Sequence, residues 1–259
     1  MSDILLREIR GPAAILTLNR PDKYNALSDA LLQAIGDAVR ELDHEDAVRG
    51  IVLAGTDKYF STGADLDGAL AANTLPDTHA MLRYFDDCNR AIERSRKPVI
   101  AAINGYCLTG GLEVALACDI RVAGTGAKFG VTSSKIGSVA GAGGIQRLSC
   151  VVGKEWAKDM LFSADFIDAE IALRIGLVSR VVAPEAVLDC ALARIDAYAA
   201  RAPLSVWYAK IAVNTGMQMD LEPALELERH LTASLFTTRD RSEGMSAFLE
   251  KREAEFKGR

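Results

Sequence analysis

The sequence is poor in the residues that build disulfide frameworks and metal centres. Its five cysteines are widely spaced and form no CxxC pair, which predicts reduced, mostly buried thiols; they are Cys88, Cys107, Cys118, Cys150 and Cys190. The three histidines stand alone without an HExxH pattern, so we expect no built-in metal site. The longest purely apolar runs, such as residues 99–103, have five or six residues, whereas a membrane-spanning helix needs about 20. We therefore expect no membrane span.

Charge of one sign is also scarce. The chain has 35 acidic and 30 basic residues among 259, and the two signs are interspersed. Nucleic-acid binding needs clustered Lys and Arg, so we expect no nucleic-acid partner. The N-terminus carries acids early and lacks the apolar segment of a signal peptide, which makes a cytoplasmic location the expectation. With 49% hydrophobic residues, a chain of this length can bury one large core.

Apolar periodicity indicates alternating strands and helices. Residues 4–9 and 14–18 flank a Gly-Pro turn and predict a hairpin. Ser28 is a plausible N-cap for a helix with apolar residues at helical spacing. Further elements are expected at residues 51–54 (strand), 79–94 (helix), 99–103 (strand), near Gly110 (helix), near Gly143 (helix) and 178–182 (strand). This alternation is typical of right-handed βαβ units in an α/β fold.

The last sixty residues change character, because three helical patterns follow and no strand is expected among them. Leu221, Leu225, Leu231 and Leu235 share one helix face, and Met245, Phe248, Leu249 and Phe256 share another. Asp240 and Glu243 have the spacing of a capping box for the last helix. Such apolar stripes fit either packing within the chain or association with other chains.

Three glycine-bearing segments are candidates for chemistry. Residues 60–66 follow a strand, and small residues there let a ligand approach the backbone, although a simple turn is the alternative. In residues 104–119, Gly110 and Gly111 open a helix whose free N–H groups and dipole form an anion or oxyanion site. Glu113 lies one turn further on; it either acts beside a group held there or merely stabilises the helix start. Residues 129–148 match no dinucleotide or phosphate-loop pattern and predict a tight loop before a helix.

In this order the segments resemble the crotonase (enoyl-CoA hydratase/isomerase) superfamily over essentially the whole chain. The resemblance is carried by residues 18–21 and 25–27, 63–66, 104–105 with 110–113, 141–148, 243–248 and 256–259. It implies an α/β core of stacked ββα turns that binds an acyl-CoA, expected at residues 1–200. It also implies a C-terminal helical region, residues 201–259, that builds homotrimers or hexamers made of two trimers.

The resemblance also implies roles for individual residues. The thioester oxygen would be held by the backbone amides of Ala64 and Gly110, with Glu113 as the acid or base. Coenzyme A would enter only as part of the substrate, with no permanently bound cofactor and no metal. Its contacts would be Lys23, Tyr24, Ala26, Asp65 and Leu66, joined by Phe248 and Lys251 of a neighbouring subunit.

The chain departs from the family pattern at one catalytic position. Hydratases of this family carry a second glutamate, usually after a proline, and these two positions fall on Ser133 and Thr132 here. Syn addition of water needs a base for the water proton and an acid for the α-carbon. Either Glu113 performs both steps while Ser133 holds the water, or the site runs another enolate reaction such as isomerisation, or the protein binds acyl-CoA without turning it over.

Overall fold

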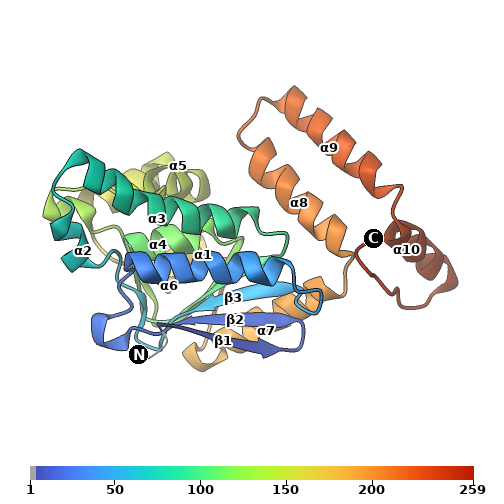
Figure 1. Ribbon diagram of the computed structural model, residues 1–259, viewed down its shortest axis with the longest axis horizontal. Coiled ribbons are helices and arrows are strands. Elements are labelled where there is room, and N and C mark those ends of the chain that lie inside the picture. The colour runs from blue at the N-terminus through green and yellow to red at the C-terminus, as the bar shows by residue number, and fades with distance from the viewer. Residues whose placement is uncertain (1–3) are drawn as a thin grey trace.

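The computed structural model describes residues 4–259 and contains two sheets surrounded by helices (Figure 1). The larger sheet has the order β1 (Leu5–Arg10), β2 (Ala13–Leu18), β3 (Gly50–Ala54), β5 (Val99–Ile103), β7 (Ile120–Gly124) and β10 (Arg180–Val182). The smaller sheet has the order β4 (Tyr59–Ser61), β6 (Tyr106–Leu108), β8 (Lys128–Gly130) and β9 (Ile167–Asp168). Only the β1–β2 and β8–β9 pairs are antiparallel among these strands.

The chain winds through the two sheets in a repeated strand–strand–helix unit. β3, β5 and β7 each enter the larger sheet, and β4, β6 and β8 follow them in the smaller one. The helices that complete these turns are α2 (Leu66–Ala71) with α3 (Leu75–Arg94), then α4 (Gly110–Ala117), then α5 (Gly144–Ser163). This arrangement confirms the expected stacked ββα fold.

Burial on both faces explains why β3 and β5, the two middle strands of the larger sheet, carry no polar side chain. All five residues of β5 are buried, as expected for a parallel strand covered on two sides. On one face lie α1 (Asp29–Asp43), α3 and α4, and on the other lies α7 (Val187–Ala199), which buries Ala191 and Ile195 against the sheet. The predicted cap of α1 is confirmed, because the Ser28 hydroxyl accepts a bond from Leu31 N at 3.3 Å. The remaining segments are α6 (Ala169–Arg174) and short 3₁₀ helices at Pro21–Lys23, Ser133–Ile136 and Pro184–Ala186.

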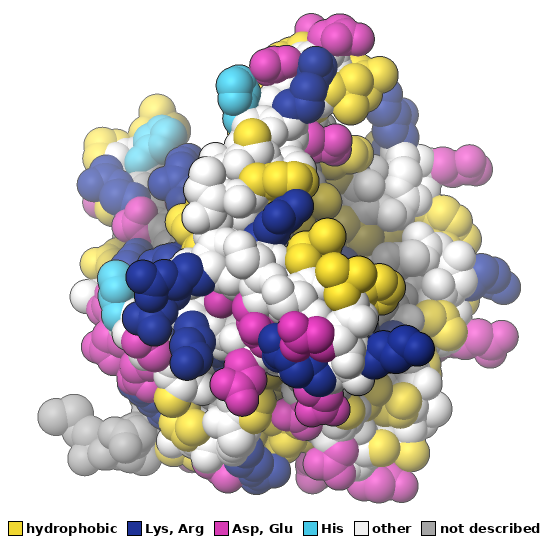
Figure 2. Space-filling model, turned by 90° about the vertical axis from the view of Figure 1, so that its right-hand side faces the viewer, with side chains coloured by type: hydrophobic (Ala, Val, Ile, Leu, Met, Phe, Trp, Pro, Cys, Tyr) yellow, Lys and Arg dark blue, Asp and Glu magenta, His cyan; other side chains and the backbone are white. Residues whose placement is uncertain are grey.

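The C-terminal helices extend away from this core. They are α8 (Pro203–Gly216), α9 (Leu221–Leu235) and α10 (Arg239–Glu250), and they occupy one end of the molecule in Figure 1. No residue of α8 or α9 is buried within the single chain. Figure 2 faces this end and shows hydrophobic side chains exposed between charged ones. No helix within residues 4–259 is long and apolar enough to cross a membrane.

Two expectations about the last helix were wrong. Thr238, and not Asp240, is the N-cap of α10, and its hydroxyl accepts a bond from Arg241 N at 3.2 Å. Asp240 and Glu243 instead accept hydrogen bonds from backbone N–H groups of the segment that follows the helix. Asp240 accepts from Lys257 N and Gly258 N, each at 2.7 Å. Phe256 lies beyond the end of α10, so it is not part of that helix face.

The cysteines are free thiols, as expected. Cys88, Cys107 and Cys118 are buried, whereas Cys150 is exposed and Cys190 is half-buried.

Candidate active site

Two loops meet where β4 and β6 end. Leu27 N donates to Gly63 O at 2.8 Å and Asp65 N donates to Leu27 O at 3.0 Å, so the Ala64 N–H between them faces the opposite side. On that side lies Gly110, where the Cβ of any other residue would stand 3.1 Å from Ala64 N. Within residues 4–259 neither the Ala64 N–H nor the Gly110 N–H has an acceptor. Two adjacent, unpaired N–H groups can bind one anionic oxygen.

The atoms around Gly110 leave no room for a side chain. A Cβ there would lie 3.0 Å from Cε1 of Phe85 as well as beside Ala64 N. Gly110 is also the first residue of α4, so its N–H has no partner inside the helix and lies at the positive end of the helix dipole. A glycine at position 110 therefore allows its N–H group to lie close to the N–H group of Ala64.

Glu113 lies on the first turn of α4 and is only 4% exposed. Its Oε1 accepts bonds from Ala142 N at 2.8 Å and Gly144 N at 2.9 Å, whereas Oε2 accepts none from residues 4–259. Burial raises the pKa of this carboxyl, against the lowering effect of the two N–H bonds and of Arg147. One oxygen is thus fixed and the other is free to exchange a proton.

The loop that holds Glu113 is itself held from two helices. Asn89 Nδ2 on α3 and Arg147 Nη1 on α5 both donate to Ala142 O, at 3.0 Å and 3.1 Å. Arg147 also makes a two-pronged ion pair with Glu93, at 2.6 Å and 2.8 Å. Gly143 has φ +95°, and a Cβ there would lie 1.7 Å from Arg147 Nη1, so only glycine lets the arginine reach the carbonyl.

Sequence reasoning missed this support for Glu113. Arg147 stands in a recognised segment, but its partner Glu93 is 54 positions away on another helix. No local pattern links the two residues, and only the folded arrangement does.

Ser133 follows β8 and begins the short 3₁₀ helix Ser133–Ile136. It is 5% exposed, and its hydroxyl has no hydrogen-bond partner within the described chain, residues 4–259. The neighbouring Thr132 is bound to Thr109, the residue before Gly110, through N–H to Oγ1 at 3.0 Å and hydroxyl to hydroxyl at 2.9 Å. The segment that carries Ser133 is therefore tied to the start of α4.

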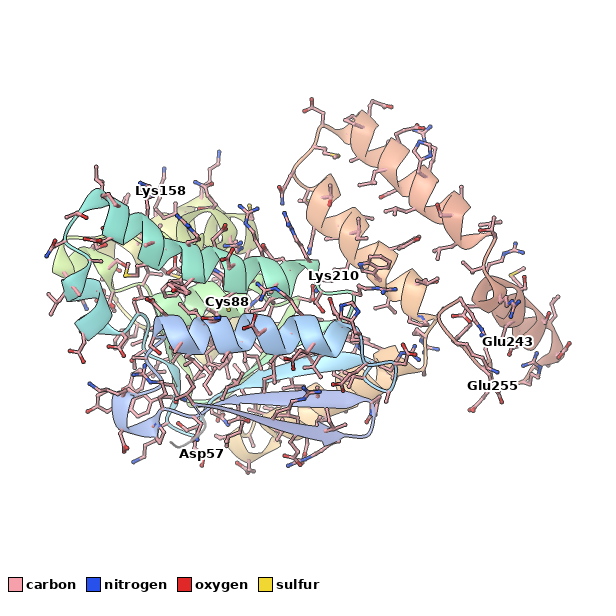
Figure 3. The ribbon with its side chains drawn as sticks, viewed as in Figure 1. Asp57, Cys88, Lys158, Lys210, Glu243 and Glu255 are labelled. Carbon is pink, nitrogen blue, oxygen red and sulfur yellow. The ribbon has the colours of Figure 1, made fainter. Side chains whose placement is uncertain are left out.

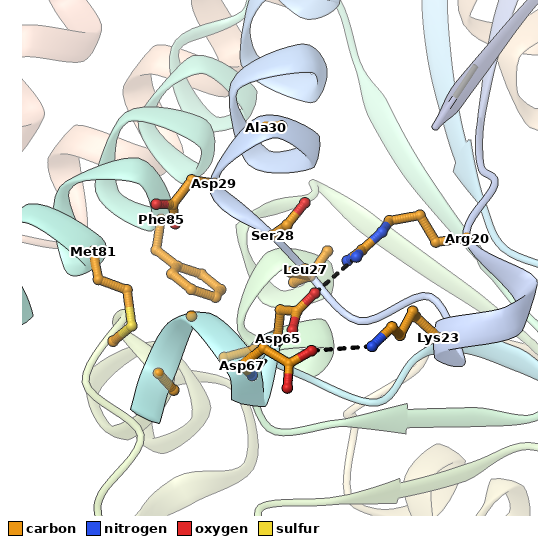
Figure 4. Close-up of a pocket in the computed structure, with 13 residues that line it drawn as sticks. Arg20, Lys23, Leu27, Ser28, Asp29, Ala30, Asp65, Asp67, Met81 and Phe85 are labelled. Atoms are coloured by element: carbon orange, nitrogen blue, oxygen red, sulfur yellow. Dashed lines mark hydrogen bonds and ion pairs between the residues drawn. The ribbon is translucent and has the colours of Figure 1, made fainter. Parts of the chain in front are cut away.

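A cavity of about 290 Å³ opens beside Ala64 (Figure 4). Arg20 and Lys23 line it, and they form ion pairs with Asp65 at 2.7 Å and Asp67 at 3.0 Å. The bond from Arg20 is the main cause that lowers the pKa of Asp65. Met81 and Phe85 of α3 supply an apolar wall. The cavity thus connects Ala64 to a rim that carries both charges, whereas Gly110, Glu113 and Ser133 are not among the residues that line it.

The expected coenzyme-A contacts divide into three groups. Lys23 and Asp65 line the cavity. Tyr24, Ala26 and Leu66 each adjoin a lining residue in the chain but do not line the cavity, and Tyr24 and Leu66 are exposed. Phe248 and Lys251 lie at α10, at the far end of the molecule from this cavity, and Phe248 is 82% exposed (Figure 1). A single chain therefore does not bring the last two to the site.

The sequence matches the family model described as enoyl-CoA hydratase/isomerase over residues 8–259. A probable enoyl-CoA hydratase of Rhizobium meliloti is 41% identical over 257 residues, which cover 99% of each chain. A short-chain-enoyl-CoA hydratase of Clostridium acetobutylicum is 38% identical over 261 residues, covering 100% of this chain and 99% of its own. The crystal structure of an enoyl-CoA hydratase from Bacillus anthracis is similar with a TM-score of 0.94 and 33% identity, covering 99% of this chain and 100% of that one.

Proposed function

The chain belongs to the enoyl-CoA hydratase/isomerase family and is an enzyme of that type, and we propose that it adds water to a 2-enoyl-CoA using Glu113 as its only catalytic carboxylate. The observation that carries this proposal is the position of Glu113. It lies one helical turn from Gly110, whose N–H group is adjacent to that of Ala64. Its Oε1 is fixed by two backbone donors and its Oε2 is free.

The first step is activation of the thioester. Its carbonyl oxygen would accept hydrogen bonds from the N–H groups of Ala64 and Gly110. Negative charge develops on this oxygen when water adds to the β-carbon, so the two donors bind the transition state more tightly than the substrate. One donor of this kind is worth roughly 3 kcal/mol. The crowding around Gly110 supports this role, because it keeps the donors close together.

The second step is proton transfer by Glu113. Its free Oε2 would take a proton from the attacking water and then deliver a proton to the α-carbon on the same face, which gives syn addition. A raised pKa suits this double role, because the carboxyl must both accept and release the proton near neutral pH. The unpartnered hydroxyl of Ser133 would hold the water.

Substrate binding would use the charged rim of the cavity. Lys23, Tyr24, Ala26, Asp65 and Leu66 would contact the coenzyme-A part of the substrate, and no permanently bound cofactor is proposed. Phe248 and Lys251 would come from a neighbouring subunit of a homotrimer or a hexamer. The exposed apolar surface of α10 supports this arrangement. A cytoplasmic location stays a prediction, which cell fractionation would test.

Crotonyl-CoA tests the proposal, because hydration removes the ultraviolet absorbance of its conjugated thioester. We expect the wild-type protein to turn it over, and Glu113→Gln to lose roughly 10³-fold or more in kcat while still binding the thioester. Ser133→Ala should lose about tenfold, the value of one hydrogen bond to the water.

Asp67→Asn is the matched control, since this carboxylate lines the cavity but pairs with Lys23. It should leave kcat nearly unchanged. Undiminished turnover in Glu113→Gln would place the acid and base elsewhere. Tight binding without turnover by the wild type would indicate another acyl group or a subunit that only binds.

A further inference from the structure

Thr109 has an unusual backbone conformation at the centre of the site. Its φ of +44° and ψ of −111° lie outside the left-handed helical region in which other positive-φ residues such as Tyr24 and Ala164 are found. A β-branched residue is especially disfavoured at positive φ. Such a conformation is energetically unfavourable and persists only where the surroundings enforce it.

Hydrogen bonds to every polar group of Thr109 enforce this conformation. Its N–H donates to Gly130 O at 2.9 Å, and its carbonyl accepts from Glu113 N at 2.9 Å. Its hydroxyl accepts from Thr132 N at 3.0 Å and lies 2.9 Å from the Thr132 hydroxyl. The residue is therefore fixed from β8, from α4 and from the segment that leads to Ser133.

This position gives Thr109 control over two catalytic groups. Rotation about its ψ angle turns the peptide that carries the Gly110 N–H, one of the two thioester donors. Its hydroxyl holds Thr132, and Ser133 is the next residue along the chain. One side chain thus sets the direction of a thioester donor and the place of the water-binding hydroxyl.

The hydroxyl bond depends on what stands at position 132. The family pattern has a proline there, and proline has no N–H to donate. Thr132 supplies that N–H and also a hydroxyl, so the contact with Thr109 accompanies the change that replaces the second glutamate with Ser133.

We propose that Thr109 is a positioning residue that aligns the Gly110 N–H with the Ser133 hydroxyl through its contact with Thr132, an inference that rests on the proposed hydration. The hydroxyl of Thr109 does not touch the substrate. It acts by fixing the loop that carries Gly110 relative to the segment that carries Ser133, so that the thioester and the water are held in the orientation needed for reaction.

Thr109→Val and Thr109→Ser test the proposal, because Val keeps the shape without the hydroxyl and Ser keeps the hydroxyl. We expect Val to lower kcat on crotonyl-CoA roughly tenfold or more, with KM changed less than about twofold, since misplaced reacting groups reduce the rate and not the coenzyme-A contacts. Ser should restore most of kcat. Thr56→Val is the matched control, because Thr56 makes two comparable bonds in the turn before β4, at 3.2 Å and 3.3 Å.

An infrared difference spectrum gives a readout that does not need turnover. Butyryl-CoA has no double bond to hydrate, and its binding should lower the thioester carbonyl frequency in the wild type. We expect a smaller shift of this frequency in Thr109→Val. Thr109→Ser and Thr56→Val should show the same shift as the wild type. If the wild type shows this shift but hydrates no enoyl-CoA, the proposed function fails while the positioning role is still measured.

A Val variant that loses only thermal stability, with kcat and the carbonyl shift unchanged, would overturn the positioning role. If Thr109→Val does not fold, Thr132→Pro removes the same N–H from the other side, and we expect the same loss of kcat and of carbonyl shift. Unchanged values in Thr132→Pro would equally overturn it.

Discussion

Glu113 combines a buried carboxylate with a fixed hydrogen-bond pattern, and this has a consequence for stability. Because burial raises its pKa in the folded chain, the folded state holds this proton more tightly than the unfolded state does. The favourable contribution is present below the ordinary glutamate pKa and is lost as pH rises through the raised value. Ionised Glu113 therefore destabilises the fold at neutral pH.

We expect Glu113→Gln to be more stable than the wild type at pH 8 and equally stable near pH 4. The Gln Oε1 can still accept from Ala142 N and Gly144 N, so the loop keeps both bonds. Urea unfolding of both proteins at the two pH values measures this. A variant that is less stable than the wild type at pH 8 would show that the buried, ionised carboxylate does not destabilise the fold.

Arg147 gives a second prediction at this scale. Its charge lowers the pKa of Glu113, although burial is the larger, opposing effect. Arg147→Gln should therefore move the acid limb of kcat/KM to higher pH, whereas Arg147→Lys keeps the charge and should move it less. Arg90→Gln, which breaks an exposed ion pair with Asp86 on the same helix α3, serves as the control. Identical acid limbs in all four proteins would contradict the coupling.

Helix α8 contacts the core through Asn214, whose Nδ2 donates to Glu93 O at 3.3 Å, and through Lys210 (Figure 3). Lys210 Nζ donates to Ile92 O at 2.9 Å, Lys97 O at 3.2 Å and Asp119 Oδ2 at 2.8 Å, so all three of its protons are used. Removing one partner of a buried pair leaves the other charge uncompensated.

We expect Lys210→Met to lower the free energy of unfolding by about 3–5 kcal/mol. Lys158→Met, at an exposed lysine on α5, should change it by less than about 0.5 kcal/mol. Urea denaturation of the two variants gives both values. A loss below about 1 kcal/mol in Lys210→Met would mean that the Lys210 contacts contribute little to the docking of α8.

The long elements were predictable because each carries its own pattern. Ser28 and the apolar residues at helical spacing after it predicted α1, and the apolar run at residues 99–103 predicted β5. The three-residue strands β4, β6 and β8 were missed, since three residues are too few to show alternation and these strands exist through pairing with one another. The Gly110 loop and Glu113 were recognised as a candidate site, but the Thr109–Thr132 contact joins residues 23 positions apart and has no local pattern.

At the scale of the whole molecule, the C-terminal region of a single chain leaves large apolar side chains exposed. Met245, Phe248 and Leu249 of α10 are exposed, and so are Val213 and Met217 at the end of α8. Association into the proposed homotrimer or hexamer would cover these side chains. Light scattering should therefore give three or six times the 27.8 kDa of one chain. A mass equal to one chain would contradict the proposed assembly.

Phe248 links the assembly to substrate binding. Phe248→Ala should raise KM for crotonyl-CoA about tenfold, equivalent to ~1.4 kcal/mol, with kcat unchanged, because it would contact coenzyme A in a neighbouring subunit and not the reacting atoms. Phe162→Ala is the control, since Phe162 on α5 is similarly exposed and does not line the cavity. An unchanged KM in Phe248→Ala would remove this residue from the site.

The central claim is that one carboxylate performs both proton transfers, and the pH dependence of kcat/KM for crotonyl-CoA hydration tests it most directly. A base and a separate acid give a bell-shaped profile, whereas one group that starts ionised gives a single acid limb. We predict a single limb at a pKa above the ordinary glutamate range, with no decline at higher pH up to the limit of protein stability. A bell-shaped profile would contradict the claim and require a second catalytic acid.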